Sequence, residues 1–301
     1  MTRITTASLS INTERNLQAA MTRLATIQDK AGSRKEIGRP SDDPAGTANV
    51  MALRAQQRQN EQFSRNVQDA NGWLSTADTA LSTVTSILQQ VRDLTVQGAN
   101  DGALSPDGKK AIATELDQLH DALIKAANTQ FMGRNVFAGT SDGAAALDPE
   151  SYGVVDVDPT YEFIGTSGVD RRIGPNSSVR VDVDGAKTFG EGADSVFQLV
   201  KNIANDLRAG TNVSTRIDEI DESLQNVLSA QVTVGSIHAT VIAADEALLS
   251  DSVALEARRS GIEDIDLGSV ILELKTQEVA YQAALSAAAR TLQPSLMDFL
   301  R

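Results

Sequence analysis

Two stretches of this chain carry apolar residues at alternating steps of three and four, over more turns than an ordinary globular domain needs. The first runs from about residue 44 to 97, and the second from about 217 to 255. Such spacing is typical of helices that pack through a narrow coiled-coil seam. At about 1.5 Å of rise per residue, the first helix would be roughly 80 Å long. The pattern predicts a mainly α protein built from long helices.

A shorter seam of the same kind lies near each end of the chain. The N-terminal seam includes Leu17, Leu24 and Ile27. The C-terminal seam includes Ile271, Leu274, Tyr281, Leu285, Leu292, Leu296 and Phe299. We expect the two ends to pair as one coiled-coil layer and the two long helices to form a second layer. The fold class is therefore a long-helix coiled-coil bundle made from the N- and C-terminal halves.

The middle of the chain departs from this helical pattern. Residues 141–193 contain Pro149, Pro159, Pro175 and many glycines, and the valines of "VRVDVDG" alternate with polar residues. Alternation with a period of two predicts strand, so we expect a small β-rich insert. The predicted organisation is 1–37 and 261–301 as a terminal coiled-coil domain, 38–46 as a joint, 47–140 and 194–260 as a helical rod domain, and 141–193 as the insert.

The segment "GRPSDDPAG", residues 38–46, is the most helix-hostile part of the N-terminal half. Pro40 biases the residue before it away from helical backbone, while Pro44 fits the first turn of the next helix. A serine or aspartate between them can cap that helix. We interpret the segment as an interdomain joint, made of Arg39, Pro40, Ser41, Asp42, Asp43 and Pro44.

Composition narrows the classes of function. The formal net charge of −13 disfavours a nucleic-acid partner, because phosphate binding needs clustered Lys and Arg. The chain has no cysteine, which excludes disulfides and thiolate metal sites. No stretch approaches 18 consecutive apolar residues, and the N-terminus lacks the apolar core of a cleaved signal peptide. We expect no membrane insertion and, if the protein is secreted, another route. Aromatic residues are only 4%, which suggests a core of small and aliphatic side chains.

Little in the sequence points to catalysis. His120 and His238 are the only histidines, and both fall on expected helices, where a hydrogen-bonded structural role is the simpler interpretation. The aspartates of "DVDG", Asp182 and Asp184, lack the downstream Glu of an EF-hand loop, so we expect them on a solvated strand face. No Walker, dinucleotide-binding or zinc-protease motif is present. We predict no enzyme activity, no cofactor and no metal.

Several of these segments together resemble one known family. "RPSDDPAG", "NVQDANGWLSTADTALSTV", "NTQFMGRNVFAGT" and the C-terminal "IEDIDLGSVILELKTQEVAYQAALSAAARTLQPSLMDFL" look like the bacterial flagellin superfamily. The resemblance covers about residues 9–141 and 194–300. "RPSDDPAG" and "VFAGT" are more similar to its hook–filament junction members than to filament flagellin.

The resemblance implies a structural protein of the bacterial flagellum. Members of the family are exported unfolded through a flagellar type III apparatus and polymerise at its distal end. It also implies a set of partners: further copies of the chain in a ring, a hook-side junction protein, filament flagellin, and a cytoplasmic export chaperone on residues 262–300. We expect the terminal seam residues to form the subunit and chaperone contacts, and to order fully only on assembly.

Two other functions stay open at this point. Filament flagellin would use the same fold in a bulk role. A cytoplasmic coiled-coil signalling rod belongs to a different class and would be a folded dimer that is not secreted, but it does not account for the β-rich insert.

Overall fold

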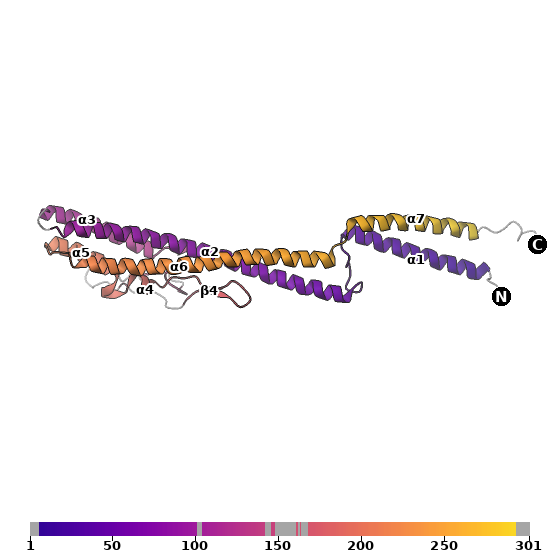
Figure 1. Cartoon of the computed structure of the whole chain (residues 1–301), viewed down its shortest axis with the longest axis horizontal. Coiled ribbons are helices and arrows are strands. Elements are labelled where there is room, and N and C mark those ends of the chain that lie inside the picture. The colour runs from indigo at the N-terminus through magenta and orange to yellow at the C-terminus, as the bar shows by residue number, and fades with distance from the viewer. Residues whose placement is uncertain are drawn as a thin grey trace, which may run out of the picture. The chain divides into compact units, whose positions relative to one another are not determined.

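A computed structural model describes residues 6–100, 104–141, 146–147, 161, 163 and 168–292, with side chains described from residue 11 to residue 290 of these ranges. The described elements are α1 (Thr6–Ser33), α2 (Pro44–Gly98), α3 (Pro106–Ala127), β1 (Gln130–Phe131), β2 (Arg134–Asn135), β3 (Asp170–Arg172), β4 (Ser178–Arg180), α4 (Gly185–Phe189), a 3-10 turn η2 (Gly192–Asp194), α5 (Val196–Ala209), α6 (Arg216–Glu263) and α7 (Leu267–Leu292). The protein is mainly α-helical, as predicted (Figure 1).

The chain divides into two compact units, each made from both halves of the sequence. The first unit comprises Met1–Gln59 and Asp251–Arg301, and the second comprises Asn60–Ser250. In the first unit α1 packs against α7 along its length (Figure 1). The predicted pairing of the two ends of the chain is therefore present in the structure.

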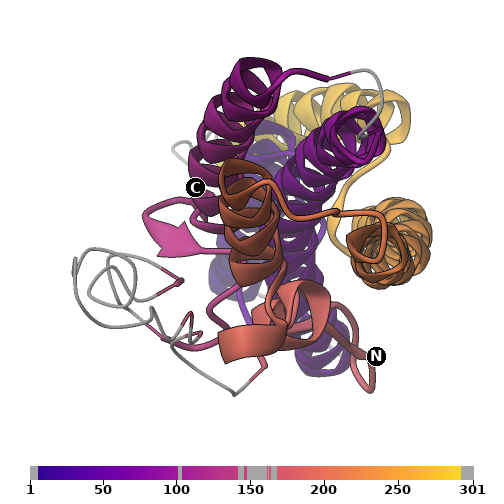
Figure 2. The ribbon, with the colours of Figure 1, turned by 90° about the vertical axis from the view of Figure 1, so that its left-hand side faces the viewer.

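The core of the second unit is the predicted seam of α2. Fully buried side chains, each at most 1% exposed, recur along it at steps of three and four: Ala70, Leu74, Ala77, Leu81, Val84, Leu88 and Val91. The seam is closed by α3, α5 and α6, and Figure 2, which looks along the helices, shows α2 between α3 and α6. α6 contributes one buried residue per seven: Ile220, Val227, Val234, Val241 and Leu248.

Polar contacts fix the antiparallel register of α2 and α6 within this second unit. Asn60 donates to the Leu248 carbonyl oxygen at 2.8 Å, and Gln231 donates to Asp78 at 3.2 Å. Farther along, Arg92 Nε lies 2.6 Å from Asp221 Oδ1. These pairs stagger the two helices so that their seams meet over the whole core.

Helix ends follow the expected chemistry with one exception. Ser105 caps α3, its hydroxyl accepting from the Gly108 amide, and Pro106 takes the first helical position as predicted. Gly210 ends α5 in the left-handed conformation, with φ of 78°. The exception is α5, where the acidic residue before the helix, Asp194, belongs to the η2 turn and Ser195 accepts from the Gln198 amide instead.

The part of the insert that the structure describes contains one short hairpin. β3 pairs antiparallel with β4, with Arg171 opposite Val179. Asp182 is not on a solvated face as expected: it is buried, paired with Arg180, and accepts from the Val169 amide at 2.5 Å. The segments around Pro149 and Pro159 and most of "TYEFIG" lie outside the described residues.

Five aromatic residues form a cluster where the insert meets the helices: Phe137, Tyr161, Phe163, Phe189 and Phe197. Phe189 lies 5.1 Å from Phe137 and 5.8 Å from Phe197, ring centre to ring centre, and Tyr161 stacks on Phe197 at 5.5 Å. The expectation of a core without aromatic anchors is therefore wrong at this position. Edge and stacked geometries of this kind stabilise packing beyond the buried area alone.

Candidate assembly surfaces and joint

The seam between α1 and α7 is the first of the predicted assembly surfaces. On α1, Ile27 is buried, and Leu17 and Leu24 are half-buried at the spacing of a coiled-coil seam. Across from them, Gln277 of α7 donates to the Ala20 carbonyl oxygen at 3.3 Å. The N-terminal seam residues thus face α7, as the sequence indicates.

The face that α7 turns toward α1 differs from the predicted one. From Leu267 on, the half-buried or buried positions among the described side chains are Val270, Leu274, Gln277, Glu278, Tyr281, Ala284 and Ala288. Leu274 and Tyr281 are shared with the prediction, whereas Ile271 and Leu285 are 53% and 42% exposed. The side chain of Leu292 and the residues Leu296 and Phe299 lie outside what the structure describes.

This difference has a physical reason. From Leu267 to Leu292 apolar residues and alanines occur on nearly every side of the helix, so periodicity alone does not select one face. The pairing with α1 uses the side through Val270, Leu274 and Tyr281. Leu272 and Val279, which are 70% and 65% exposed, remain on the other side of α7. A helix with apolar surface on two sides is suited to contact a further partner.

The joint segment caps α2 in the way its sequence predicts. Asp43 is the residue that takes the capping position, since its Oδ1 accepts from the Gly46 amide at 2.9 Å, and Pro44 begins the helix. Asp42 closes the preceding turn by accepting from the Arg39 amide at 2.8 Å. A Cβ at residue 46 would lie 2.3 Å from the Asp43 carboxylate, so this close approach requires glycine.

The segment that follows α1 and the segment that follows α6 are hydrogen-bonded to each other. Lys35 and Asp264 form an isolated antiparallel bridge. The Glu36 amide donates to the Glu263 carbonyl oxygen at 2.7 Å, and the Ile265 amide donates to the Arg34 carbonyl oxygen at 3.3 Å. The helical break lies just after Gly261, since α6 ends at Glu263 and α7 begins at Leu267.

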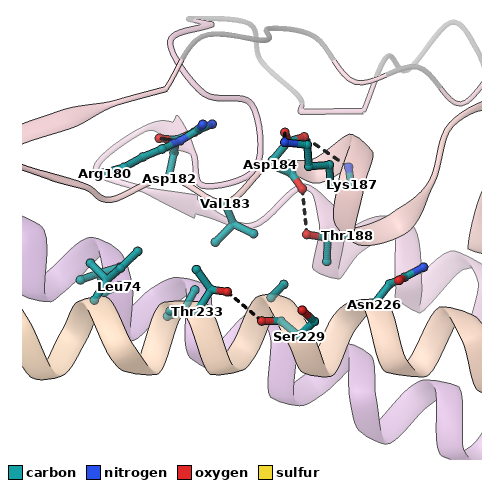
Figure 3. A pocket seen from close by; sticks show the side chains of 13 residues that line it. Leu74, Arg180, Asp182, Val183, Asp184, Lys187, Thr188, Asn226, Ser229 and Thr233 are labelled. Carbon is teal, nitrogen blue, oxygen red and sulfur yellow. Dashed lines mark hydrogen bonds and ion pairs between the residues drawn. The ribbon is translucent and has the colours of Figure 1, made fainter.

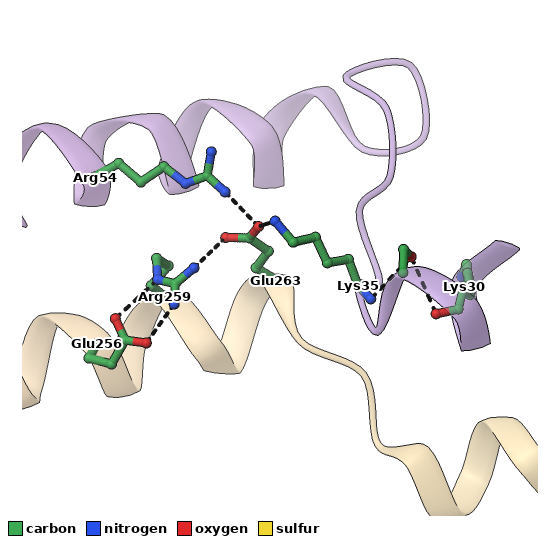
Figure 4. A network of polar contacts seen from close by, with 7 residues as sticks. Lys30, Lys35, Arg54, Glu256, Arg259 and Glu263 are labelled. Atoms are coloured by element: carbon green, nitrogen blue, oxygen red, sulfur yellow. Dashed lines mark hydrogen bonds and ion pairs between the residues drawn. The ribbon is translucent and has the colours of Figure 1, made fainter.

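One buried carboxylate holds this joint together. The side chain of Glu263 is 3% exposed and forms ion pairs with Lys35, with Arg54 at 2.6 Å and with Arg259 at 3.0 Å (Figure 4). Burial alone would raise the pKa of Glu263, but hydrogen bonds and the positive charges of Lys35 and Arg54 lower that pKa to about 2. Glu263 therefore stays ionised, and its ion pairs connect the segment after α1 to both α2 and α6.

A second carboxylate extends the same network. Glu256 accepts from Gln57 at 2.8 Å and pairs with Arg259 at 2.5 Å (Figure 4 shows the arginine pair). These hydrogen bonds, from Arg259 first and Gln57 second, lower the pKa of Glu256. Arg259 is thus shared between two carboxylates on α6, which orients its guanidinium toward Glu263.

The histidines and aspartates considered for chemistry have structural partners. His120 Nε2 lies 3.0 Å from the Tyr161 hydroxyl, and burial lowers the His120 pKa. His238 Nε2 lies 2.5 Å from Asn71 Oδ1. Asp184 caps α4 by accepting from the Lys187 amide at 3.2 Å. Among the described residues, no group of three or more His, Cys, Asp or Glu side chains is placed to hold a metal ion.

A pocket of about 290 Å³ lies between the β4–α4 stretch and α6 in the second unit (Figure 3). Its floor is apolar, with Leu74 and Val183, and Asn226 and Thr233 of α6 line the opposite wall. Arg180 at its edge pairs with Asp182 at 2.8 Å, which raises the Arg180 pKa. Because the charged groups at this edge pair with one another, the pocket presents no free charge for a ligand.

α6 carries more apolar surface than its packing uses. It contains an 18-residue window with a mean hydropathy of 1.5, of which 17% is buried, so by length and composition it meets the criterion for a membrane span. Serine, threonine and glutamine interrupt the apolar run of α6, so the helix contains no 18 consecutive apolar residues. Within the second unit its fully buried residues form a single seam, and half-buried residues such as Leu224 and Ile237 pack beside it, whereas Leu228, Val232, Ile242 and Leu249 are exposed.

Comparison with known proteins agrees with this architecture. The bacterial flagellin N-terminal helical region matches residues 4–142, and the bacterial flagellin C-terminal helical region matches residues 217–300. A flagellin of Halalkalibacterium halodurans is 27% identical over 97% of both chains. Flagellar hook-associated protein 3 of Salmonella typhimurium is 26% identical over 86% of this chain and 87% of its own.

Solved structures show the same fold. The flagellar hook-associated protein 3 of Legionella pneumophila superimposes with a TM-score of 0.61 at 15% identity, covering 71% of this chain and 99% of its own. The paired terminal helices, the long antiparallel helices between them and these matches lead to one assignment. The chain belongs to the bacterial flagellin superfamily.

Proposed function

We propose that this protein is a structural component of the bacterial flagellum, forming an adaptor ring that joins the hook to the filament. The observation that carries the proposal is the correspondence with hook-associated protein 3, which extends over 86% of this chain. The fold match to a second hook-associated protein 3 supports it. Superfamily membership counts against the cytoplasmic signalling rod.

The geometry of the first unit suits an adaptor. Glu263 forms ion pairs with Lys35, Arg54 and Arg259. These contacts restrain the segments that follow α1 and α6. A subunit between two different assemblies must transmit force, and a clamped joint does so better than a free linker. We propose that Arg39 to Pro44 and Glu263 together serve this role.

The proposed partners follow from the same assignment. Copies of the chain contact one another and filament flagellin, and a hook-side junction protein lies below the ring. The exposed apolar residues of α7, among them Ile271 and Leu272, support a cytoplasmic export chaperone that covers residues 262–300 before secretion. Export then proceeds through the flagellar type III apparatus, without a cleaved signal peptide, to an extracellular site on the flagellum.

Filament flagellin is the second candidate. It is favoured by the 27% identity with a flagellin over 97% of both chains. The two roles place very different numbers of copies on each flagellum, because a ring uses one layer of subunits and a filament uses many.

Deletion of the gene with plasmid complementation tests the proposal. An adaptor predicts hooks without filaments while filament flagellin still leaves the cell and collects in the medium. A filament subunit predicts that the major secreted flagellin itself disappears. Normal flagella in the deletion strain would contradict both roles. The complemented strain is the control for effects on neighbouring genes.

A further inference from the structure

The outward side of α6 carries a second apolar stripe that no described residue of its own unit covers. Leu228, Val232, Ile242 and Leu249 are 42%, 73%, 48% and 68% exposed. With Gly235 and Ala239 they recur at steps of three and four from Leu228 to Ile242, and Leu249 follows seven residues later, which places all six on one side of the helix. We call these six residues the α6 ridge. Its centre lies roughly 100° around the helix from the buried seam through Val234.

From Leu228 to Ile242 the ridge lies on an uncharged stretch of an acidic protein, and the exposed Glu246 interrupts it before Leu249. Residues 223–244 contain no Asp, Glu, Lys or Arg, although the chain as a whole carries a net charge of −13. Two copies of such a chain repel each other wherever their acidic surfaces meet. An uncharged apolar stripe is a place where like-charged copies can approach, which favours a second copy as the occupant.

The second unit also offers a groove that matches the ridge. It has a volume of about 280 Å³ and is lined by Thr76, Thr79, Ala80 and Thr83 of α2 together with Ala126 and Thr129 near the end of α3. Thr79 lies roughly 100° around α2 from Asp78, the residue bonded to α6, so the subunit's own α6 does not fill the groove. Residues 79–91 of α2 are likewise uncharged.

The threonine hydroxyls of this groove are already hydrogen-bonded within their own chain, which makes the groove less polar than its composition indicates. The hydroxyls of Thr76, Thr79 and Thr83 donate to the carbonyl oxygens four residues earlier, at 2.8 to 2.9 Å. Thr129 donates to the Ala126 carbonyl oxygen at 2.8 Å. Because each of these four threonine hydroxyl protons already has an acceptor, covering them leaves no threonine donor unpaired, and Ser75, which also lines the groove, is exposed.

Gly235 provides an independent sign of close approach. It lies inside α6, where glycine is unfavourable, and a Cβ there would meet nothing within 4 Å in its own chain. No close contact within the described part of the subunit therefore explains why this position is a glycine. A partner helix that approaches the ridge closely would use the space.

We infer that the α6 ridge of one copy docks in the α2–α3 groove of the next copy. The inference rests on the proposed function, because a ring requires a head-to-tail contact between two different surfaces of one subunit. Leu228 and Val232 would enter the groove, and Gly235 would allow the two helices to approach. The ridge and groove are then the lateral contact of the second unit.

Cysteine cross-linking tests this contact without background, since the chain has no cysteine of its own. Thr79→Cys is combined in turn with Leu228→Cys, Val232→Cys and Ala239→Cys in the full chain. Under mild oxidation of concentrated purified protein and of isolated flagella, at least one pair should give a ladder of disulfide-linked multimers. Thr79→Cys with Thr240→Cys, which lies on another side of α6, is the matched control and should give none.

The single variants identify the type of interface. Val232→Cys alone should form little dimer, because a head-to-tail contact does not bring two ridges together. Efficient Val232→Cys dimers would overturn the inference in favour of a symmetric ridge-to-ridge contact. Failure of all three pairs in both preparations would also overturn it. Binding to phosphatidylethanolamine–phosphatidylglycerol vesicles that Val232→Asp abolishes would assign the ridge to a membrane instead.

The same samples separate this inference from the proposed function. If the chain is present on flagella and no ladder forms, the ridge–groove contact is wrong while a flagellar role remains. If the chain is absent from flagella but the purified protein gives the ladder, the contact is right and the adaptor role is wrong. Circular dichroism of each variant checks that the helices are intact.

Discussion

The Arg54 guanidinium lies 2.6 Å from the Glu263 carboxylate, although the two residues are 209 positions apart in the sequence. Lys35 and Arg259 bind the same carboxylate, so three cations share one buried anion. The joint of the first unit therefore depends on a single acidic residue. Removing it leaves three cations without their shared anion, whereas removing one cation leaves the carboxylate with two partners.

Glu263→Gln should loosen the joint. The change leaves Lys35, Arg54 and Arg259 facing a neutral amide, and we expect a loss of about 1–3 kcal/mol, reduced from the value for a fully buried pair because the cations are partly exposed. Hydrogen exchange of the Glu36 amide, which donates to the Glu263 carbonyl, reports the loss directly. Glu256→Gln is the control and should have a smaller effect. Unchanged protection in Glu263→Gln would contradict the assigned role.

The joint should also respond to acid in a defined range. The pKa of Glu263 is about 2 in the folded protein against an ordinary value of 4.5, so ionisation of this group stabilises the fold above pH 4.5. This contribution is lost progressively as the pH falls from about 4.5 to 2. Protection of the Glu36 amide is expected to be flat from pH 7 to 5 and then to fall. In Glu263→Gln the fall in this range should be smaller, and an identical fall would show that another group is responsible.

Gly235→Ala should raise stability and weaken assembly. Alanine is a better helix former than glycine by about 0.5–1 kcal/mol, and the added Cβ meets nothing in its own chain. Gly261→Ala is a matched control, because Gly261 is also helical and open but lies away from the α6 ridge. Both variants should melt at higher temperature. Only Gly235→Ala should reduce multimer formation, measured by light scattering of the concentrated protein, and equal effects would count against the ridge.

The α2 seam should behave as a conventional core. Leu88 is fully buried, and Leu88→Ala is expected to lower the free energy of unfolding by about 2–5 kcal/mol because it leaves a cavity. Val96→Ala, at a position 46% exposed on the same helix, should cost much less. Urea unfolding followed by circular dichroism measures both. Similar costs for the two variants would mean that the seam is placed incorrectly.

The terminal helix pair should gain order on assembly. Among the side chains of α1 and α7 that the structure describes, Ile27, Val270 and Ala288 are the buried apolar ones, which is a small core for helices of this length. Amides of these helices are expected to exchange quickly in the monomer and slowly in isolated flagella. Equal protection in both states would show that the pair is stable alone.

Long-range periodicity made the helices predictable from sequence, whereas side-chain partners were not. The α2 seam through Leu81 and Leu88 is visible because one spacing persists for many turns. The side of α7 that faces α1 was misjudged, because apolar residues surround that helix. Arg259 and Glu263 are four positions apart on α6, a spacing that favours an ion pair. The Lys35 and Arg54 contacts required the fold, and so did the contact between Phe137 and Phe189.

Immunogold electron microscopy of intact cells, with an antibody against residues 145–190, tests the adaptor role most directly. The account predicts one narrow band of label at the distal end of the hook. Label along the whole filament would contradict it and identify the chain as a filament subunit. No external label would contradict a flagellar location altogether.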